Sequence, residues 1–527
     1  MSTRPAYPSA RLLTAQWAVR SFTGLRFELL QGLVLSAVMG VAIVLRFVDL
    51  GAVGYNSDEA VYVGQAAAIA QVPVLRELFP IFRAHPLLFQ FFLSLFYTLG
   101  AGDWLGRTLA AAVGVATIML VYALGRRLYG PWGGVLAALF LAVMPYHVVA
   151  SRQVMLDGPM ALASTLTLFL MVRFGETEHP LWLYAAGAGM GLTVLTKETG
   201  ILMVGAIYAF LALTPRIRVR VWDICLSLLT MVLIIAAYPL SILLAGGGSS
   251  GTTRQYLVWQ LFRRPNHTWE FYLTSVAPAI GIPLILAALL GLFMYRRQNG
   301  WPEKLLVLWV LVPVIFFQLW PTKGFQYLLP AAPPLALLAA APLVRWRSWT
   351  AATARVRLLR YLLAVILAGA IILPLGVASW NRIHPAGSGK VLAGSGGVPG
   401  GREMGEWISA NVPQGATFMT IGPSMANIIR YYGHRPAFGL SVSPNPLHRN
   451  PSYQPVLNPD FHIRSGELQY LVWDSFSAER TTFFSEKLLY YTQKYGGRVI
   501  HTETVTLTDA SGRKLEKPVI IIYEVRP

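Results

Sequence analysis

Long apolar runs recur along this chain, and they constrain its fold more than any other feature. About eleven runs have the length and composition of membrane-spanning helices, which need roughly 20 mainly apolar residues. They cover residues 29–48, 106–125, 132–150, 158–173, 181–196, 199–214, 222–245, 275–294, 304–320, 326–344 and 360–379. The 527 residues are 55% hydrophobic and only 13% charged, about half the charged share of a soluble domain. The sequence therefore predicts a polytopic α-helical membrane protein.

The distribution of charge predicts the orientation of the chain. The net charge of +19 comes from short basic clusters between apolar runs. This is typical of cytoplasmic loops and argues against a nucleic-acid partner. If residues 1–28 are cytoplasmic and the short run 87–99 does not cross, every basic cluster faces the cytoplasm. We therefore expect 87–99 to lie along the outer interface or to be re-entrant, within an outer loop at 49–104.

The composition changes after the last apolar run. We expect a transmembrane module over 29–380, a Gly-rich linker at 381–401 and a soluble α/β domain over 402–527. That domain has alternating helix and strand patterns, with strands expected at 417–421, 470–474, 498–506 and 519–525. An odd number of crossings places it outside the cell, at the plasma (inner) membrane.

Two acidic motifs lie close to the predicted outer surface. Asp58 and Glu59 follow the first span, and Asp157 follows the third. Capping of the following helix, by Ser57 or Asp58 in the first motif and by Asp157 in the second, explains each motif as well as catalysis does. A carboxylate beside lipid is also suited to act as a general base, because burial raises the pKa of such a group. Adjacent side chains do not share a helix face, so we expect different roles for Asp58 and Glu59.

Scattered cations and aromatic residues lie on the same predicted side of the membrane. The positive-inside rule disfavours lysine there, so these groups indicate an anion site such as a lipid phosphate. Lys197 has an alternative partner in the adjacent Glu198, and Arg83 has an alternative role as an interfacial anchor. The candidate binding residues are Arg83, His85, Arg152, Lys197, Arg263, Arg264, His267, Lys323 and Tyr327. No metal-ligand spacing is present in the sequence.

Five ordered elements resemble the lipid-dependent glycosyltransferases of the GT-C superfamily, in particular the protein O-mannosyltransferase and aminoarabinose transferase-like branch. They span roughly residues 25–380. The elements are Asp58-Glu59, Arg83-Ala84-His85-Pro86-Leu87, the turn at 125–130 leading to Arg152 and Asp157, the Gly-Leu-Thr-x-x-Thr-Lys ending at Lys197, and Lys323 with Tyr327-Leu328-Leu329-Pro330. The second element lacks the further proline usual in mannosyltransferases.

The resemblance implies an inverting transfer from a polyprenyl-phosphate monosaccharide. Asp58 is then the base, Glu59 and Asp157 orient substrates, and Arg83, Lys197 and Lys323 hold the phosphate. It implies no obligatory metal or other cofactor, and partners that are membrane lipid, the lipid-linked sugar and a protein, lipid or glycan acceptor. Two alternatives remain, a transporter of lipid-linked glycans and an inactive scaffold. The transporter predicts ionisable residues near mid-membrane and internal repeats, whereas the charges here cluster at helix ends.

Overall fold

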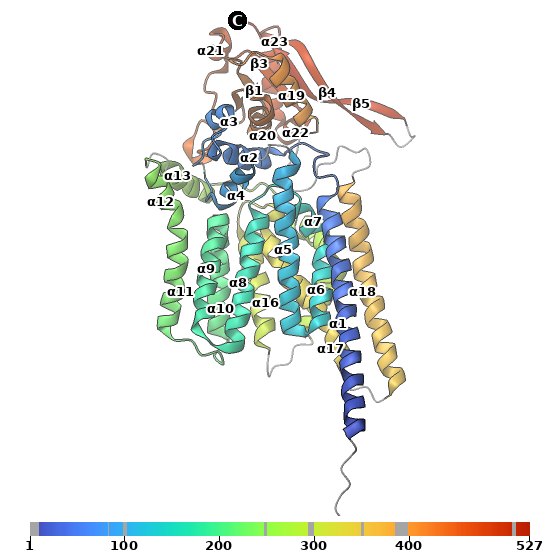
Figure 1. Ribbon diagram of the computed structural model, residues 1–527. Coiled ribbons are helices and arrows are strands. Elements are labelled where there is room, and N and C mark those ends of the chain that lie inside the picture. The colour runs from blue at the N-terminus through green and yellow to red at the C-terminus, as the bar shows by residue number, and fades with distance from the viewer. Residues whose placement is uncertain are drawn as a thin grey trace, which may run out of the picture.

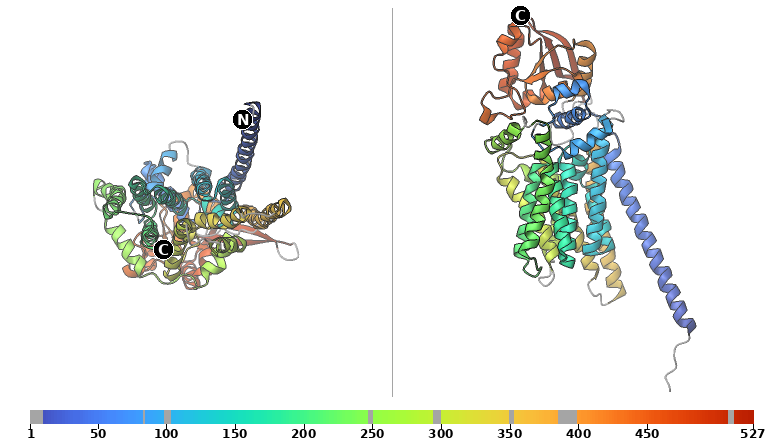
Figure 2. Two further views of the ribbon diagram at one scale, coloured as in Figure 1. Left: turned by 90° about the horizontal axis from the view of Figure 1, so that it is seen from below. Right: turned by 60° about the vertical axis from the view of Figure 1, so that its left-hand side comes forward.

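A bundle of long helices carries a separate domain at one end (Figures 1 and 2). The computed structural model describes residues 10–82, 84–97, 103–246, 250–293, 300–348, 353–384, 399–508 and 513–527. The C-terminal domain is stacked on the bundle, and short helices lie across the junction between them (Figure 1).

The bundle is formed by long helices that run between its two ends and by short helical segments that continue or interrupt them. In chain order they are α1 (Ala10–Phe47), α5 (Asp103–Tyr129), α6 (Pro131–Val143), α7 (Pro145–Ser151), α8 (Asp157–Thr177), α9 (Pro180–Thr196), η1 (Glu198–Ile201), α10 (Leu202–Leu213), α11 (Val221–Ile235), α12 (Ala237–Leu244), η2 (Tyr272–Val276), α14 (Ala277–Ile280), α15 (Ile282–Phe293), α16 (Trp301–Leu319), η3 (Phe325–Ala331), α17 (Ala332–Ser348) and α18 (Ala354–Ile383).

The number of spans depends on how broken and short helices are counted. Among the described residues, seven helices are long and apolar enough to cross a membrane, or nine if each of two bent pairs is one span. The helices α9 and α10, with 17 and 12 residues, run in the same bundle but fall short of that length. The polytopic helical fold is confirmed, and the count of eleven stays a prediction.

Two runs that we expected to be single spans are sharply bent. Residues 132–150 form α6 and α7 at an angle of 65°, and in the described part of the run 275–294 the chain bends by 83° between the helices Tyr272–Ile280 and Ile282–Phe293. Pro145 begins α7 and cannot donate a backbone hydrogen bond to the preceding turn. The freed carbonyls of Leu141 and Ala142 accept instead from the buried guanidinium of Arg46, at 3.3 and 3.0 Å. The second bend has Gly281 at φ +105°, which favours glycine.

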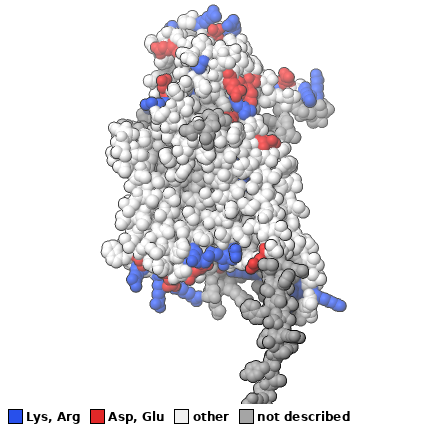
Figure 3. Space-filling view, in the orientation of Figure 1, with Lys and Arg blue, Asp and Glu red and all other residues white. Residues whose placement is uncertain are grey.

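Basic side chains gather at the end of the bundle that is remote from the C-terminal domain (Figure 3). Arg126 and Arg127 lie in the last turn of α5, and Arg220 immediately precedes α11. This one-sided distribution follows the pattern that the sequence predicts for a cytoplasmic face.

Four short helices form the layer at the other end. They are α2 (Ser57–Ile69), α3 (Pro73–Leu78), α4 (Leu88–Tyr97) and α13 (Ser250–Leu261). Helix α4 has 10 residues, too few to cross a bilayer, and it packs against α2. Residues 87–99 are therefore not a full span in the described part, as expected.

The C-terminal domain is built around a five-stranded sheet of order β2-β1-β3-β5-β4. Its strands are β1 (Phe418–Thr420), β2 (Ala437–Gly439), β3 (Tyr470–Asp474), β4 (Arg498–Thr508) and β5 (Lys514–Glu524). The first three are mutually parallel, and β5 pairs antiparallel with both β3 and β4. Its helices are α19 (Gly401–Asn411), α20 (Pro423–Ile428), η4 (Ile429–Gly433), η5 (Pro446–His448), α21 (Pro459–Arg464), α22 (Ser475–Arg480) and α23 (Thr482–Lys494).

Polar contacts fix this domain to the layer of short helices. The Tyr432 hydroxyl donates to Asp103 Oδ2 at 2.5 Å and accepts from the backbone N–H of Tyr55 at 2.7 Å. Asn427 Nδ2 donates to the Ser57 hydroxyl at 3.1 Å, beside Asp58. The domain therefore has a defined position relative to the N-terminus of α2.

Candidate functional site

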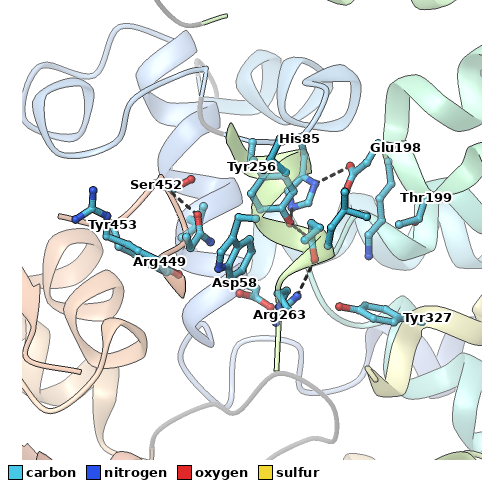
Figure 4. A pocket seen from close by; sticks show the side chains of 18 of the residues that line it. Asp58, His85, Glu198, Thr199, Tyr256, Arg263, Tyr327, Arg449, Ser452 and Tyr453 are labelled. Atoms are coloured by element: carbon cyan, nitrogen blue, oxygen red, sulfur yellow. Dashed lines mark hydrogen bonds and ion pairs between the residues drawn. The ribbon is translucent and has the colours of Figure 1, made fainter. Parts of the chain in front are cut away.

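A cavity of about 880 Å³ lies between the helical bundle and the C-terminal domain. Seven parts of the chain line it: α2, residues 84–85, the α9–α10 turn, α13 with Arg263, α16, η3 and the C-terminal domain. Figure 4 shows the polar side chains that converge there. Expected site residues in its wall are Asp58, His85, Lys197, Arg263 and Tyr327.

Asp58 and Glu59 have different surroundings, because neighbouring helical residues point about 100° apart. Asp58 is half-buried and lines the cavity. Glu59 is 1% exposed and is not part of the cavity wall. Its carboxylate accepts from Arg107 Nε and Nη2 at 2.8 and 2.7 Å and from the backbone N–H groups of Val154 and Asn56 at 2.9 and 3.0 Å.

The start of α2 is capped by Asn56, not by Ser57 or Asp58 as the sequence suggested. The Asn56 side chain accepts from the backbone N–H groups of Asp58 and Glu59, and Glu59 completes a capping box. Asp58 is therefore held in the first helical turn, where it forms part of the cavity wall.

Lys197 pairs with Asp157, and this corrects the alternative pairing with Glu198. The Lys197 ammonium donates to both Asp157 carboxylate oxygens at 2.8 and 2.9 Å, with both side chains buried. It also lies 4.9 Å from the centre of the Tyr327 ring, a cation–π distance. Asp157 does not line the cavity, and its carboxylate contacts Lys197, which does.

Glu198 contacts His85 instead. Its Oε2 lies 2.7 Å from His85 Nδ1, and the other ring nitrogen lies 3.5 Å from the Tyr256 hydroxyl. Burial raises the pKa of Tyr256 and of Tyr62 well above 10, so both remain neutral phenols that can donate hydrogen bonds. The sequence did not single out Glu198 or Tyr256 as site residues, because pairing across distant turns leaves no local signal.

Several expected site residues lie outside the cavity wall. The Lys323 ammonium donates to the carbonyls of Gln318 and Trp320 at the end of α16, at 2.9 and 3.2 Å. Arg152 donates to the carbonyls of Leu45 and Val48 at 3.2 and 2.7 Å. Arg264 and His267 are exposed and do not line the cavity. Arg83 lies outside the described residues.

The C-terminal domain supplies a share of the wall that the sequence did not predict. Its residues are Pro423, Ser441, Val442, Ser443, His448, Arg449, Asn450, Ser452 and Tyr453, which we call the C-terminal wall. In the described part of the chain, no group of three or more His, Cys, Asp or Glu side chains is placed to hold a metal ion. The expectation of a metal-free reaction stays a prediction.

Two family profiles match the bundle. Residues 84–242 match the dolichyl-phosphate-mannose-protein mannosyltransferase family, and residues 266–386 match the Alg9-like mannosyltransferase family. A curated relative, the undecaprenyl phosphate-alpha-4-amino-4-deoxy-L-arabinose arabinosyl transferase of Pectobacterium carotovorum subsp. carotovorum (strain PC1), is 27% identical over 222 residues. That alignment covers 39% of this chain and 39% of the relative.

Solved structures share the fold over nearly the whole chain. ArnT from Cupriavidus metallidurans has a TM-score of 0.65 at 15% identity, covering 95% of this chain and 98% of that one. The same protein bound to undecaprenyl phosphate has a TM-score of 0.63 at 16% identity, with 94% and 98% covered. The oligosaccharyltransferase AglB from Archaeoglobus fulgidus, in complex with an inhibitory peptide and a dolichol-phosphate, has a TM-score of 0.57 at 14% identity, with 93% and 74% covered.

Proposed function

Because the chain belongs to the GT-C superfamily of membrane glycosyltransferases, we propose that it moves a monosaccharide from a polyprenyl-phosphate carrier to an acceptor hydroxyl, with inversion at the anomeric carbon. The observation that carries the proposal is one cavity lined by Asp58 together with the cations Lys197 and Arg263. A carboxylate and separate cations are the two kinds of group that this reaction needs.

In the proposed reaction, Asp58 accepts the proton of the acceptor hydroxyl while the oxygen of that hydroxyl attacks the anomeric carbon. The new C–O bond forms as the bond from that carbon to the phosphate oxygen breaks. The carrier phosphate leaves with the bonding electron pair, and Asp58 later releases its proton to water. An adjacent cation stabilises the charge that develops on the leaving phosphate.

The lining of the cavity supports an assignment of the residues that hold the phosphate. We assign Lys197, Arg263 and His85 to it, since all three line the cavity. Lys323 is left out, because it lies outside the cavity wall, where its ammonium donates to the carbonyls at the end of α16. Asp157 and Glu198 are assigned as positioning residues for Lys197 and His85, respectively.

The donor assignment is supported by the apolar part of the wall and by the relatives. Leu202, Phe316, Phe317 and Trp320 line the cavity from α10, α16 and the end of α16, which suits an isoprenoid chain. Undecaprenyl phosphate is bound by the structurally similar ArnT and is part of the donor named for the curated relative. The basic end of the bundle supports a site on the extracytoplasmic side of the plasma (inner) membrane, with the C-terminal domain outside.

The proposal is tested by Asp58→Asn. We expect at least about a hundredfold loss of sugar transfer from polyprenyl-phosphate donors, the scale of a removed general base. Membranes containing the full chain are incubated with a panel of labelled donors, and the labelled sugar that leaves the polyprenyl-phosphate donor for any other lipid, protein or glycan is counted after separation. The matched control is Glu77→Gln, an exposed carboxylate on α3 outside the cavity wall. Transfer at the wild-type rate by Asp58→Asn, with normal protein level, would remove Asp58 from the mechanism.

A further inference from the structure

The cavity has two chemically different sides, and Asp58 lies between them (Figure 4). In that view Arg449, Ser452 and Tyr453 lie to one side of Asp58, and Glu198, Thr199 and Tyr327 lie to the other. The first group belongs to the C-terminal wall, and the second belongs to the helical bundle. A base between two substrates needs this arrangement, with the donor on one side and the acceptor on the other.

The topology of the sheet explains why the C-terminal wall is suited to binding a ligand. Strands β1, β2 and β3 are parallel, and β1 lies between the other two. In open α/β sheets, ligands bind beyond the carboxyl ends of the parallel strands. Pro423 follows β1, and Ser441, Val442 and Ser443 follow β2, so both segments leave those carboxyl ends and enter the cavity wall.

The position of the C-terminal wall is fixed relative to Asp58. Asn427, in the helix that Pro423 begins, is fully buried and donates to Ser57, the residue before Asp58. On the other side, η5 packs against α13, whose Tyr256 and Trp259 also line the cavity. The C-terminal wall is therefore pre-organised, which lowers the entropic cost of binding a ligand there.

The side chains of the C-terminal wall are mostly neutral and polar. Three serine hydroxyls and the carboxamide of Asn450 can each donate and accept hydrogen bonds. Tyr453 adds an aromatic ring with a polar end. One guanidinium, that of Arg449, also belongs to this wall, whereas the bundle side presents Lys197 and Arg263 with a larger aromatic and aliphatic surface. Mixed donors and acceptors beside an aromatic face match a ligand that carries many hydroxyl groups.

We infer that the C-terminal wall is a binding site for a saccharide acceptor, which it holds with one hydroxyl directed toward Asp58. This inference rests on the proposed function, and it adds the chemical class of the acceptor. A peptide acceptor is less well matched. Extended peptides are held mainly by backbone pairing at a sheet edge, and the edge strand β2 (Ala437–Gly439) is not part of the cavity wall.

The test measures binding of two ligands to the full chain in lipid nanodiscs. Trp259 and Trp320 line the cavity, so quenching of tryptophan fluorescence reports its occupancy. The probes are undecaprenyl phosphate for the bundle side, hexyl β-glucoside and hexyl β-galactoside for the C-terminal wall, and a serine- and threonine-containing hexapeptide for comparison. The variants are Tyr453→Ala, Tyr453→Phe and Arg263→Ala. The control is Gln454→Ala, exposed and next to Tyr453 but outside the wall.

We expect Tyr453→Ala to raise the Kd of a glycoside at least about tenfold, which is 1.4 kcal/mol, and to change the Kd of undecaprenyl phosphate less than twofold. Arg263→Ala is expected to raise the Kd of undecaprenyl phosphate and to change the Kd of a glycoside less than twofold. We expect Tyr453→Phe to retain most glycoside binding and Gln454→Ala to bind both ligands as the wild type does. The inference is overturned if the wild type binds neither glycoside, if Tyr453→Ala binds them normally, or if the peptide takes the Tyr453-dependent site.

Failure of the proposed function gives a different result. A wild-type chain that binds glycosides in a Tyr453-dependent way but does not bind undecaprenyl phosphate refutes the lipid-linked donor and leaves the saccharide site in place.

Discussion

The Glu59–Arg107 pair gives the sharpest test of how the site is supported. Both side chains are buried, at 1% and 4% exposed, and the carboxylate accepts four hydrogen bonds. In Glu59→Gln one oxygen becomes an NH₂ group that faces two donors. The Arg107 guanidinium also loses its buried counter-charge. Two buried donors lose their acceptor at about 1–3 kcal/mol each, and breaking a buried ion pair costs about 3–5 kcal/mol in total.

We therefore expect Glu59→Gln to lower the thermal unfolding temperature of the purified full chain by several degrees. The double variant Glu59→Gln with Arg107→Met removes the unpaired charge, and it should regain part of that loss, as coupled residues do in a double-mutant cycle. Asp58→Asn is the matched comparison, because it changes the adjacent carboxylate without touching this network; its unfolding temperature should stay close to wild type. If Glu59→Gln keeps the wild-type unfolding temperature but loses transfer activity, Glu59 contacts substrate and the supporting role assigned to it is wrong.

Three further predictions follow from other parts of the chain. Burial raises the pKa of Asp474 from 3.8 to about 6, so the folded state disfavours its charge and the local stability around β3 falls as pH rises from about 4 to 6. Asp474→Asn should therefore increase the hydrogen-exchange protection of β3 over that of the wild type at pH 7, by up to about 3 kcal/mol, and should have little effect near pH 3.5. If the difference between variant and wild type is the same at both pH values, this reasoning is wrong. Gly187→Val should destabilise the bundle, because a Cβ at Gly187 would lie 2.1 Å from a carbonyl oxygen of α11. A Cβ at Gly369 would meet nothing within 4 Å, so Gly369→Val should be tolerated; equal unfolding temperatures for the two variants refute the close packing at Gly187. In a Cys225→Ser background, Gln454→Cys should react with an impermeant thiol reagent on intact cells. Labelling only after lysis would show that the chain has the opposite membrane orientation.

Hydropathy and charge predicted the architecture well because a lipid bilayer restricts a spanning chain to few kinds of structure. Each crossing needs a long apolar helix, and the basic loops gather at one face. The same reasoning missed the bends at Pro145 and Gly281, since a broken helix within a bundle keeps its apolar composition. It also placed the cap of α2 one or two residues late, because Asn56 and Ser57 are both good N-cap residues and only the backbone geometry distinguishes them.

The positions of the residues expected at an anion site were predicted in part. Lys197 was correctly placed at the same end of the bundle as Asp58, and both line one cavity. Lys323 and Arg152 carry the same sequence signal, a cation near the outer end of a span, yet both donate to carbonyls at helix ends. A cation can pair either with the partial negative charge of free carbonyls at a helix C-terminus or with the full negative charge of a lipid phosphate. Sequence position alone cannot tell these two partners apart.

The adjacent carboxylates Asp58 and Glu59 have different surroundings, because Asp58 lines the cavity and Glu59 is buried against Arg107. The helical turn directs Glu59 inward to Arg107, where its hydrogen bonds tie together α2, α5 and the segment before α8. That interior pairing fixes the first turn of α2, which carries Asp58 into the cavity between the bundle and the C-terminal wall. A catalytic carboxylate must be held within a fraction of an ångström, and the residue beside it provides that restraint only if it is itself fully paired. A change at Glu59 should therefore reduce activity by misplacing Asp58, whereas a change at Asp58 should reduce it by removing the proposed base. We expect Glu59→Asp to impair both stability and transfer, and Asp58→Asn to impair transfer alone.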